Sequence, residues 1–303
     1  MTQSARPKVA LAIDLGGTKA SFALVDEHGV LLTRSKRPSR EAGRAVSFEA
    51  LAASALQAVR AAGLSWPDVH AAGVVVPGIY DPARERAWAP NLWGGDEVPL
   101  LEELSGRLPL PIAIDSDRSG YVLGEQWQGA ARGCRDAVFL AVGTGIGAGI
   151  LSDGRLVRGS RGIAGAVGWF GLDRRWREEY ARLGLFEAEA AGPALARRAG
   201  AASAEEAAEA ARRGDPKARA AVDETVEWLA MGTANLISAL NPEVVVLGGG
   251  LMQACDLFLE PLRRAVRRFA QPLAFEQCRI EPTQLGEDAA LFGAARLALD
   301  LAP

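Results

Sequence analysis

Two glycine-rich segments contain the residue types that could hold a polyphosphate. The first is Asp14–Lys19 (Asp-Leu-Gly-Gly-Thr-Lys), and the second is Gly143–Gly149 (Gly-Thr-Gly-Ile-Gly-Ala-Gly). Glycines let the backbone turn tightly and bring its N–H groups close to an anion. A lone segment of this kind would more often be a plain hairpin, but two in one chain suggest a polyphosphate gripped from two sides.

A nucleotide bound with Mg²⁺ needs backbone N–H groups, a hydroxyl and a carboxylate near the metal. The residues expected to supply them are Asp14, Gly16, Gly17, Thr18 and Lys19 in the first turn and Gly143, Thr144 and Gly145 in the second. The triplet Gly248, Gly249 and Gly250 follows a predicted strand and precedes a helix, so it could admit adenine and ribose against bare backbone. An ordinary strand-to-helix turn is the alternative interpretation of this triplet.

The second turn also matches the dinucleotide pattern G-x-G-x-x-A over residues 143–148. That pattern requires a helix that begins at the glycines, whereas residues 149–154 continue as strand and turn. No G-x-x-x-x-G-K-[ST] segment is present. The phosphate site is therefore expected to be neither of the Rossmann nor of the Walker kind.

Phosphoryl transfer to an alcohol also needs a base near the hydroxyl, typically worth ~10²–10⁴ in rate. Asp117 is the best candidate, because it follows a short predicted strand at 112–114 and precedes a predicted helix at 119–127. In open α/β sheets, ligands bind outside the carboxyl ends of such strands. The alternative is that Asp117 or Ser116 only caps that helix.

The elements that must position these residues recur in both halves of the chain. Each half opens with strand, glycine turn, strand, tight turn and strand. The first half continues with a helix at 47–62, a strand at 72–76, an irregular stretch at 80–98 and a helix at 100–107. The second continues with helices over 186–240, a strand at 244–247, a helix at 257–270, a strand near 279–280 and a final helix at 288–301. Alternating strands and helices in two halves predict a duplicated α/β unit, with nucleotide between the halves.

Composition excludes several classes of protein. The net charge is −3, from 34 basic and 37 acidic residues, which gives no electrostatic sign of nucleic-acid binding. The basic runs 174–177 and 263–268 are expected to lie on solvated helix faces. The N-terminus lacks a secretory profile, and no run approaches the ~20 apolar residues of a membrane span. These features predict a cytoplasmic protein without membrane or nucleic-acid partners.

Cysteine and histidine are too scarce for a structural zinc site. The only ones are Cys134, Cys255, Cys278, His28 and His70, and no two cysteines form a C-x-x-C pair. General-base chemistry would therefore depend on a carboxylate.

Taken in order, these segments resemble the ROK family of sugar kinases, repressors and open reading frames, within the actin-like ATPase superfamily. The resemblance covers nearly the whole chain and rests on Asp14–Lys19, Val76–Gly78, Pro90–Leu92, Asp115–Asp117, Leu123–Glu125, Gly143–Gly149, Asn241–Pro242, Gly248–Gly250 and Gly286–Ala290. It implies an α/β fold of the actin-like ATPase (ribonuclease H-like) type, with two duplicated domains. We expect an N-terminal domain of residues 1–117 plus the C-terminal helix 288–303, and a larger domain of residues 118–287.

The resemblance also implies roles for single residues. Asp117 stands where the family has the base that deprotonates a sugar hydroxyl, and Gly78 and Asn91 stand at sugar-contacting positions. ATP with Mg²⁺ would be the phosphoryl donor, with Asp14 near the metal. The family's repressor branch carries a winged helix ahead of the first turn, for which the residues before Asp14 leave no room. A DNA-binding repressor is therefore not expected, whereas a homodimer is.

The departures from the family concern the acceptor side. Ser116 replaces the Asn beside the base, and Gly-Glu-x-Gly-His appears as Gly-Ala-Val-Gly-Trp over residues 165–169. The zinc-binding cysteine cluster is replaced by residues 170–185, which contain no cysteine, while the Glu that follows it is retained as Glu187. No zinc is therefore expected.

Two of these departures bear on the acceptor itself. Without metal, Trp169 is expected to fill the vacated space and brace the loop; the alternative is that it stacks on the substrate ring. The loss of Glu at Ala166 should change which sugar is preferred, so plain glucose is not expected to be the best acceptor. The sequence thus predicts an ATP-dependent carbohydrate kinase in which Ser116, Glu187, Asn91 and Gly78 contact the acceptor. The rival interpretation is a catalytically silent sugar or nucleotide sensor on the same fold.

Overall fold

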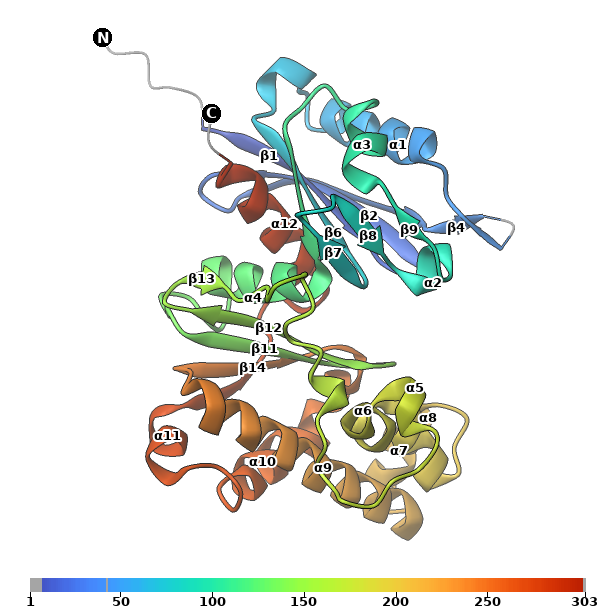
Figure 1. Cartoon of the computed structure of the whole chain (residues 1–303), viewed down its shortest axis with the longest axis vertical. Coiled ribbons are helices and arrows are strands. Elements are labelled where there is room, and N and C mark those ends of the chain that lie inside the picture. Colours follow the sequence, from blue (N-terminus) through green and yellow to red (C-terminus); the bar gives the residue numbers. More distant parts are fainter. Residues whose placement is uncertain (1–6, 42, 302–303) are drawn as a thin grey trace. The chain divides into compact units, whose positions relative to one another are not determined.

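The computed structural model describes residues 7–41 and 43–301 (Figure 1). The two extremes of the expected N-terminal domain, residues 1–6 and 302–303, lie outside the described residues. The chain divides into two compact units. Unit 1 comprises Met1–Gly129, Arg158–Ile163 and Asp288–Pro303, and unit 2 comprises Ala130–Val157 and Ala164–Glu287.

Each unit is built on a five-stranded mixed sheet. In unit 1 the order is β10 (Ile112–Ser116), β6 (Ala71–Val76), β1 (Val9–Leu15), β2 (Lys19–Asp26) and β3 (Leu31–Pro38). In unit 2 it is β15 (Arg279–Pro282), β14 (Val244–Gly248), β11 (Ala137–Val142), β12 (Ile146–Ser152) and β13 (Arg155–Leu156). In both, the first three strands are parallel and the last three form an antiparallel meander. The shared order confirms the predicted duplication of one α/β unit.

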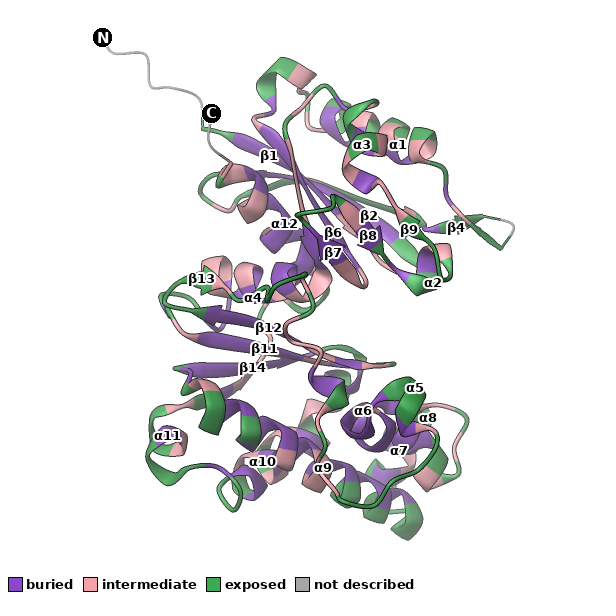
Figure 2. Ribbon diagram, viewed as in Figure 1, coloured by how far each residue is buried: buried purple, intermediate pink, exposed green. Residues whose placement is uncertain are grey.

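The strands β6, β1 and β2 of unit 1 are buried on both faces, as their apolar residues predict, whereas the edge strand β3 is largely exposed (Figure 2). Alternate residues of β1 belong to two cores. Leu11 and Ile13 pack with α1 (Phe48–Ala61) and α3 (Leu100–Ser105), whereas Ala10 and Ala12 pack with α12 (Ala289–Leu299). A short sheet lies beside these elements, formed by β7 (Ile79–Asp81), β8 (Arg86–Trp88) and β9 (Glu97–Val98).

The expected domain boundary after residue 117 differs from the division seen in the structure. Helix α4 (Asp117–Gln128) belongs to unit 1, because it packs against α12 through glycines that allow close backbone approach. A Cβ atom at Gly124 would lie 2.1 Å from the carbonyl oxygen of Ala289, and one at Gly293 would lie 1.8 Å from that of Gly120. The boundary therefore falls after Gly129.

Unit 2 covers its sheet with long helices. The core of Val138, Leu140, Val245 and Leu247 packs with α9 (Pro216–Leu240) and α10 (Cys255–Val266). The same core continues through α6 (Leu185–Ala190), α7 (Gly192–Ala199), α8 (Ala204–Arg212) and α11 (Pro272–Gln277). Asn241 ends α9 in the left-handed conformation (φ 45°), which asparagine adopts at helix ends more readily than most residues do.

Three further elements are short. They are the hairpin of β4 (Arg40–Glu41) and β5 (Arg44–Ala45), helix α2 (Pro90–Trp93) and helix α5 (Tyr180–Leu183). The expected irregular stretch at 80–98 is thus wrong, because it contains β7, β8, α2 and β9. The expected helix at 174–177 is also wrong, because these residues form a loop that leads into α5. Within residues 7–41 and 43–301, no helix has both the length and the apolar character that a membrane span needs.

Candidate active site

Acidic residues lie at the carboxyl ends of the parallel strands of unit 1. Asp14 of β1 and Asp115 of β10 are both in register with Val75 of the strand between them. Ser116 ends β10 and begins α4, where its Oγ accepts a hydrogen bond from the backbone N–H of Ser119 at 3.3 Å. Ser116 is therefore the N-cap residue of the helix, while Oδ1 of Asp117 accepts a hydrogen bond from the N–H of Arg118 at 2.8 Å.

The environment of Asp117 is suited to proton transfer. Burial raises the pKa of its carboxyl group to about 6, and the positive charge of Arg118 opposes this rise. Tyr121 lies one helical turn further along α4, and its own pKa is raised by burial and by the charges of Asp117 and Asp14. Tyr121 is thus within electrostatic reach of both carboxylates. The sequence pattern identified neither Arg118 nor Tyr121, since neither belongs to a motif.

The first glycine turn joins β1 to β2 in this same unit. A Cβ atom at Gly16 would lie 2.8 Å from the carbonyl oxygen of Lys19, so the turn requires glycine there. The carbonyl oxygen of Thr18 accepts a hydrogen bond from Ser39 at 3.0 Å, while the side chains of Thr18 and Lys19 are exposed. The carboxylate of Asp14, the hydroxyl of Thr18 and the glycine backbone together fit a polyphosphate with Mg²⁺.

Two predicted acceptor residues lie near these groups in unit 1. The Cβ atom of Asn91 is 3.4 Å from the point where a Cβ of Gly17 would lie, so Asn91 flanks the first turn. The carbonyl oxygen of Gly78 accepts a hydrogen bond from Nη2 of Arg118 at 3.4 Å. Gly78 must be glycine, because a Cβ would approach the carbonyl oxygen of Trp88 to 2.1 Å. Unit 1 therefore brings Gly17 beside Asn91 and Gly78 beside Arg118.

The second glycine turn joins β11 to β12 in unit 2. The carbonyl oxygen of Gly143 accepts a hydrogen bond from the N–H of Gly192 at 2.8 Å, which fixes the start of α7 to the turn. Oε2 of Glu187 accepts a hydrogen bond from the N–H of Ile146 at 2.8 Å. Burial raises the pKa of Glu187, and this hydrogen bond opposes the rise. The predicted acceptor residue Glu187 thus lies against the second turn.

A pocket of about 370 Å³ opens beside the second turn. Its lining includes Gly143, Thr144 and Gly250 from the predicted nucleotide site. The other lining residues are Gly192, Pro193, Ala196, Ala202, Ser203, Ala204, Glu205 and Leu251. Sequence reasoning missed the stretch from Gly192 to Glu205, whose small residues have no functional signature.

The three glycines at the end of β14, of which Gly248 is the strand's last residue, differ in what a side chain there would meet. A Cβ at Gly248 would lie 2.1 Å from the ring of Phe139, and one at Gly249 (φ +88°) would lie 2.5 Å from the carbonyl oxygen of Val142. A Cβ at Gly250 would meet nothing within 4 Å. Packing therefore accounts for Gly248 and Gly249, whereas Gly250 faces the pocket.

The loop at residues 164–170, here termed the acceptor loop, docks on β12. The N–H of Ala148 donates to the carbonyl oxygen of Gly165 at 2.8 Å, and a Cβ at Gly165 (φ +85°) would approach Ala148 to 1.8 Å. Trp169 is 57% exposed, so the expectation that it fills a space inside the protein is wrong. Phe170 instead stacks on the buried ring of Phe186, with centroids 6.4 Å apart.

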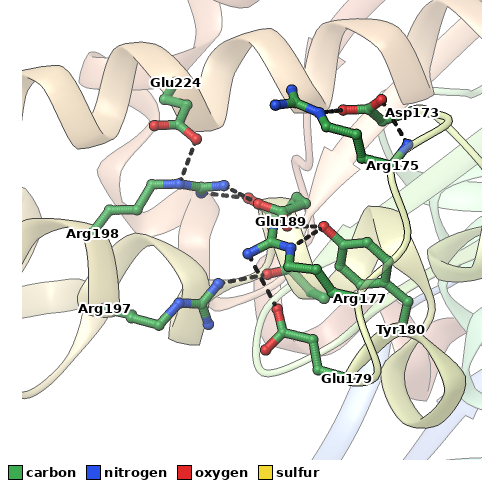
Figure 3. A network of polar contacts seen from close by, with 10 residues as sticks. Asp173, Arg175, Arg177, Glu179, Tyr180, Glu189, Arg197, Arg198 and Glu224 are labelled. Carbon is green, nitrogen blue, oxygen red and sulfur yellow. Dashed lines mark hydrogen bonds and ion pairs between the residues drawn. The ribbon is translucent and has the colours of Figure 1, made fainter.

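After this loop, Arg177, Tyr180, Glu189, Arg198 and Glu224 form a network of charged and aromatic side chains, beside a separate pair of Asp173 and Arg175 (Figure 3). Within the part of the chain that the structure describes, no group of three or more His, Cys, Asp or Glu side chains could hold a metal ion.

Comparison with known proteins agrees with this arrangement. The model of the "ROK family" matches residues 10–301. The glucokinase of Thermotoga maritima is 32% identical, with 96% of this chain and 98% of the relative covered, and that of Streptomyces coelicolor is 31% identical, with 97% and 99% covered.

Solved structures of ROK kinases are also similar to this chain. The ROK glucokinase of Streptomyces griseus, in complex with glucose and AMPPNP, has a TM-score of 0.77 at 29% identity, covering 97% of this chain and 100% of its own. The ROK hexokinase of Thermus thermophilus has a TM-score of 0.80 at 30% identity, with 96% and 98% covered. With the same duplicated α/β units and a family match over nearly its whole length, this chain belongs to the ROK family and has the actin-like ATPase fold.

Proposed function

We propose that this protein is an ATP-dependent carbohydrate kinase, which transfers the γ-phosphoryl group of ATP to a sugar hydroxyl. The observation that carries the proposal is the position of Asp117, whose pKa is about 6, at the carboxyl end of a parallel strand. The same unit carries the first glycine turn and Asn91. Relatives of the chain are glucokinases and, in Brucella suis, the bifunctional enzyme NanE/NanK, which is 32% identical over 95% of this chain and 53% of that protein.

In this proposal Asp117 takes the proton from the acceptor hydroxyl. The hydroxyl oxygen then bonds to the γ-phosphorus, and the bond from that phosphorus to the bridging oxygen of ADP breaks. A base with a pKa just below neutral is ionised at the working pH and still basic enough to accept the proton. When bound, Mg²⁺ would neutralise charge on the phosphates, and Asp14 would lie near it.

The remaining predicted residues would hold the two substrates. The phosphates would be bound by the two glycine turns, through the backbone of Gly16, Gly17, Gly143 and Gly145 and through Thr18, Lys19 and Thr144. Adenosine would be bound by Gly248–Gly250 and the pocket at α7. Gly78, Asn91, Ser116, Glu187 and Trp169 would orient the acceptor. We infer no zinc requirement, a homodimeric state and a cytoplasmic location. Ala166 and Trp169 lead us to propose an acceptor other than plain glucose.

The test is an assay of ADP release over a panel of hexoses, amino sugars, pentoses and cyclitols. We expect turnover with at least one member, and loss of turnover in Asp117→Ala with AMPPNP binding retained. Undiminished activity in Asp117→Ala would overturn the assignment of the base. Sugar or AMPPNP binding without turnover of any acceptor would instead indicate the silent sensor.

A further inference from the structure

The carboxylate of Glu189 is the centre of the network in Figure 3. Its side chain is only 3% exposed, and it accepts a hydrogen bond from the hydroxyl of Tyr180 at 2.5 Å. The guanidinium groups of Arg177 and Arg198 form ion pairs with its two oxygens. A buried carboxylate is stable only when it is paired in this way. We call these four residues the Glu189 cluster.

The cluster joins segments that come from separate parts of unit 2. Arg177 lies in the loop before α5, Tyr180 begins α5, and Arg198 lies on α7. Arg198 also donates to the carbonyl oxygen of Glu189 at 2.5 Å and pairs with Glu224 of α9 at 2.8 Å. Nε of Arg177 donates to the hydroxyl of Tyr180 at 2.6 Å. The short helix α6, which carries Glu189, is thereby tied to three neighbouring segments.

The same helix carries Glu187 on its other side. Two residues along an α-helix are separated by roughly 200° around its axis, so Glu187 points away from the cluster. Its Oε2 accepts a hydrogen bond from the N–H of Ile146 at 2.8 Å. The same oxygen would lie 2.7 Å from a Cβ atom at Gly145. A small rotation of α6 would break this contact with the second turn. The cluster therefore determines where Glu187 lies.

Two more contacts connect the Glu189 cluster to the proposed sites of both ligands. Gly184 joins α5 to α6, and a Cβ there (φ +82°) would lie 2.4 Å from the carbonyl oxygen of Gly168 in the acceptor loop, next to Trp169. On the other side, α7 begins at Gly192, which bonds to Gly143 and lines the 370 Å³ pocket. The acceptor loop and the pocket are thus both in direct contact with segments that the Glu189 cluster joins.

We propose that the Glu189 cluster positions the acceptor-side groups Glu187 and Trp169 and the nucleotide pocket at α7 together, and so couples the binding of the two substrates. Its members are positioning residues and do not touch substrate. The names of the two ligands rest on the proposed function. The two arginines have different parts in this arrangement. Arg177 holds the segment on the acceptor side, whereas Arg198 also holds α7.

The experiment compares Arg177→Met and Arg198→Met in the full chain with Arg263→Met. Arg263 is a matched control, because it pairs with Glu260 at 2.6 Å and Glu281 at 2.9 Å, away from α5, α6 and α7. We expect Arg177→Met to raise the KM of the acceptor about 3- to 30-fold and to leave the KM of ATP unchanged. Arg198→Met should raise both KM values. Arg177→Lys should restore part of the acceptor KM, since lysine keeps the charge but not the planar fork.

Thermal unfolding of each variant separates positioning from stability. The control should lower Tm without changing either KM. Two results would overturn the inference. In the first, Arg263→Met changes the KM values as much as Arg177→Met and Arg198→Met do. In the second, Arg177→Met and Arg198→Met lower Tm but leave both KM values unchanged. If the wild-type protein releases no ADP with any acceptor, the proposed function fails, and calorimetry with AMPPNP decides the inference alone. Weaker AMPPNP binding in Arg198→Met than in Arg263→Met would support it, and equal binding would overturn it.

Discussion

Arg118 donates its backbone N–H to Oδ1 of the neighbouring Asp117 at 2.8 Å, while its guanidinium reaches the carbonyl oxygen of Gly78. Burial raises the pKa of Asp117, and the charge of Arg118 limits that rise, so that the pKa is about 6. A single residue thus adjusts the basicity of the proposed base and contacts a proposed sugar-binding position.

Removal of the Arg118 charge should move the pH profile. In Arg118→Met the opposing charge is lost, so the pKa of Asp117 should rise above its value of about 6. The acidic limb of kcat/KM should therefore shift to higher pH. Arg60→Met, which changes an exposed arginine on α1, should leave the limb in place. A limb that stays fixed or shifts to lower pH in Arg118→Met would contradict this account.

Asp117→Asn should be more stable than the wild-type protein at neutral pH. The pKa of Asp117 is about 6 in the folded protein against an ordinary value of 3.8, so the folded state binds more protons between these values. Stability therefore falls as pH rises through this window, and the ionised carboxylate destabilises the fold above it. We expect a higher Tm for Asp117→Asn at about pH 7.5, and we expect this difference to disappear as the pH falls below 3.8, the lower edge of the window. Thermal scans at several pH values test this, and a lower Tm at neutral pH would refute it.

Gly250→Leu should block nucleotide binding without unfolding the protein. A Cβ at Gly250 meets no atom within 4 Å, and the position lines the pocket beside the second turn. We expect AMPPNP binding to weaken by about 1.4 kcal/mol or more, a tenfold change. Gly95→Leu is the matched control, because a Cβ there also meets nothing within 4 Å, and Gly95 lies outside the pocket. Calorimetry that shows equal affinity for the two variants would remove the pocket from the nucleotide site.

Trp169→Ala should affect the acceptor and not the stability. Because the side chain is 57% exposed, its loss should change the free energy of unfolding by no more than about 0.5 kcal/mol. We expect the KM of the acceptor to rise, and Trp169→Phe to recover most of the loss because it keeps an aromatic face. Steady-state kinetics and thermal scans provide the two measurements. An unchanged KM would exclude stacking of Trp169 on the substrate. A large fall in Tm would show that Trp169 stabilises the acceptor loop.

The strands and glycine turns could be predicted because their signals are local. The buried apolar runs Val9–Ile13 and Val244–Leu247 are followed within three residues by glycines, of which Gly16 and Gly249 leave no room for a Cβ atom. Strands β8 and β9 could not be found in this way. They have three and two residues, too few for any periodicity to appear.

The parts of the candidate site that the sequence missed depend on distant contacts. Residues 174–177 have the composition of a solvated helix face, yet Arg177 pairs with a carboxylate 12 positions later in the chain, and the segment is a loop. The pocket at α7 and α8 is lined largely by alanine and glycine, which act through the space that they leave open. Trp169 is exposed, whereas its neighbour Phe170 stacks on Phe186, a partner that the loop's own sequence does not reveal.

Helix α12 follows every segment of unit 2 in the sequence, yet it closes a core that begins at Ala10. Its residues Ala290, Leu291 and Ala294 cover the face of the first sheet that Ala10 and Ala12 form. Until α12 is synthesised, that face has only part of its cover, from α4 side chains such as Tyr121 and Trp127, whereas every segment of unit 2 has already been made. Synthesis of unit 1 thus begins before that of unit 2, but the core of unit 1 is completed after it. A premature stop just before α12 would leave a finished second unit attached to an N-terminal sheet whose apolar face lacks this helix, and apolar surface exposed in this way drives aggregation of nascent chains.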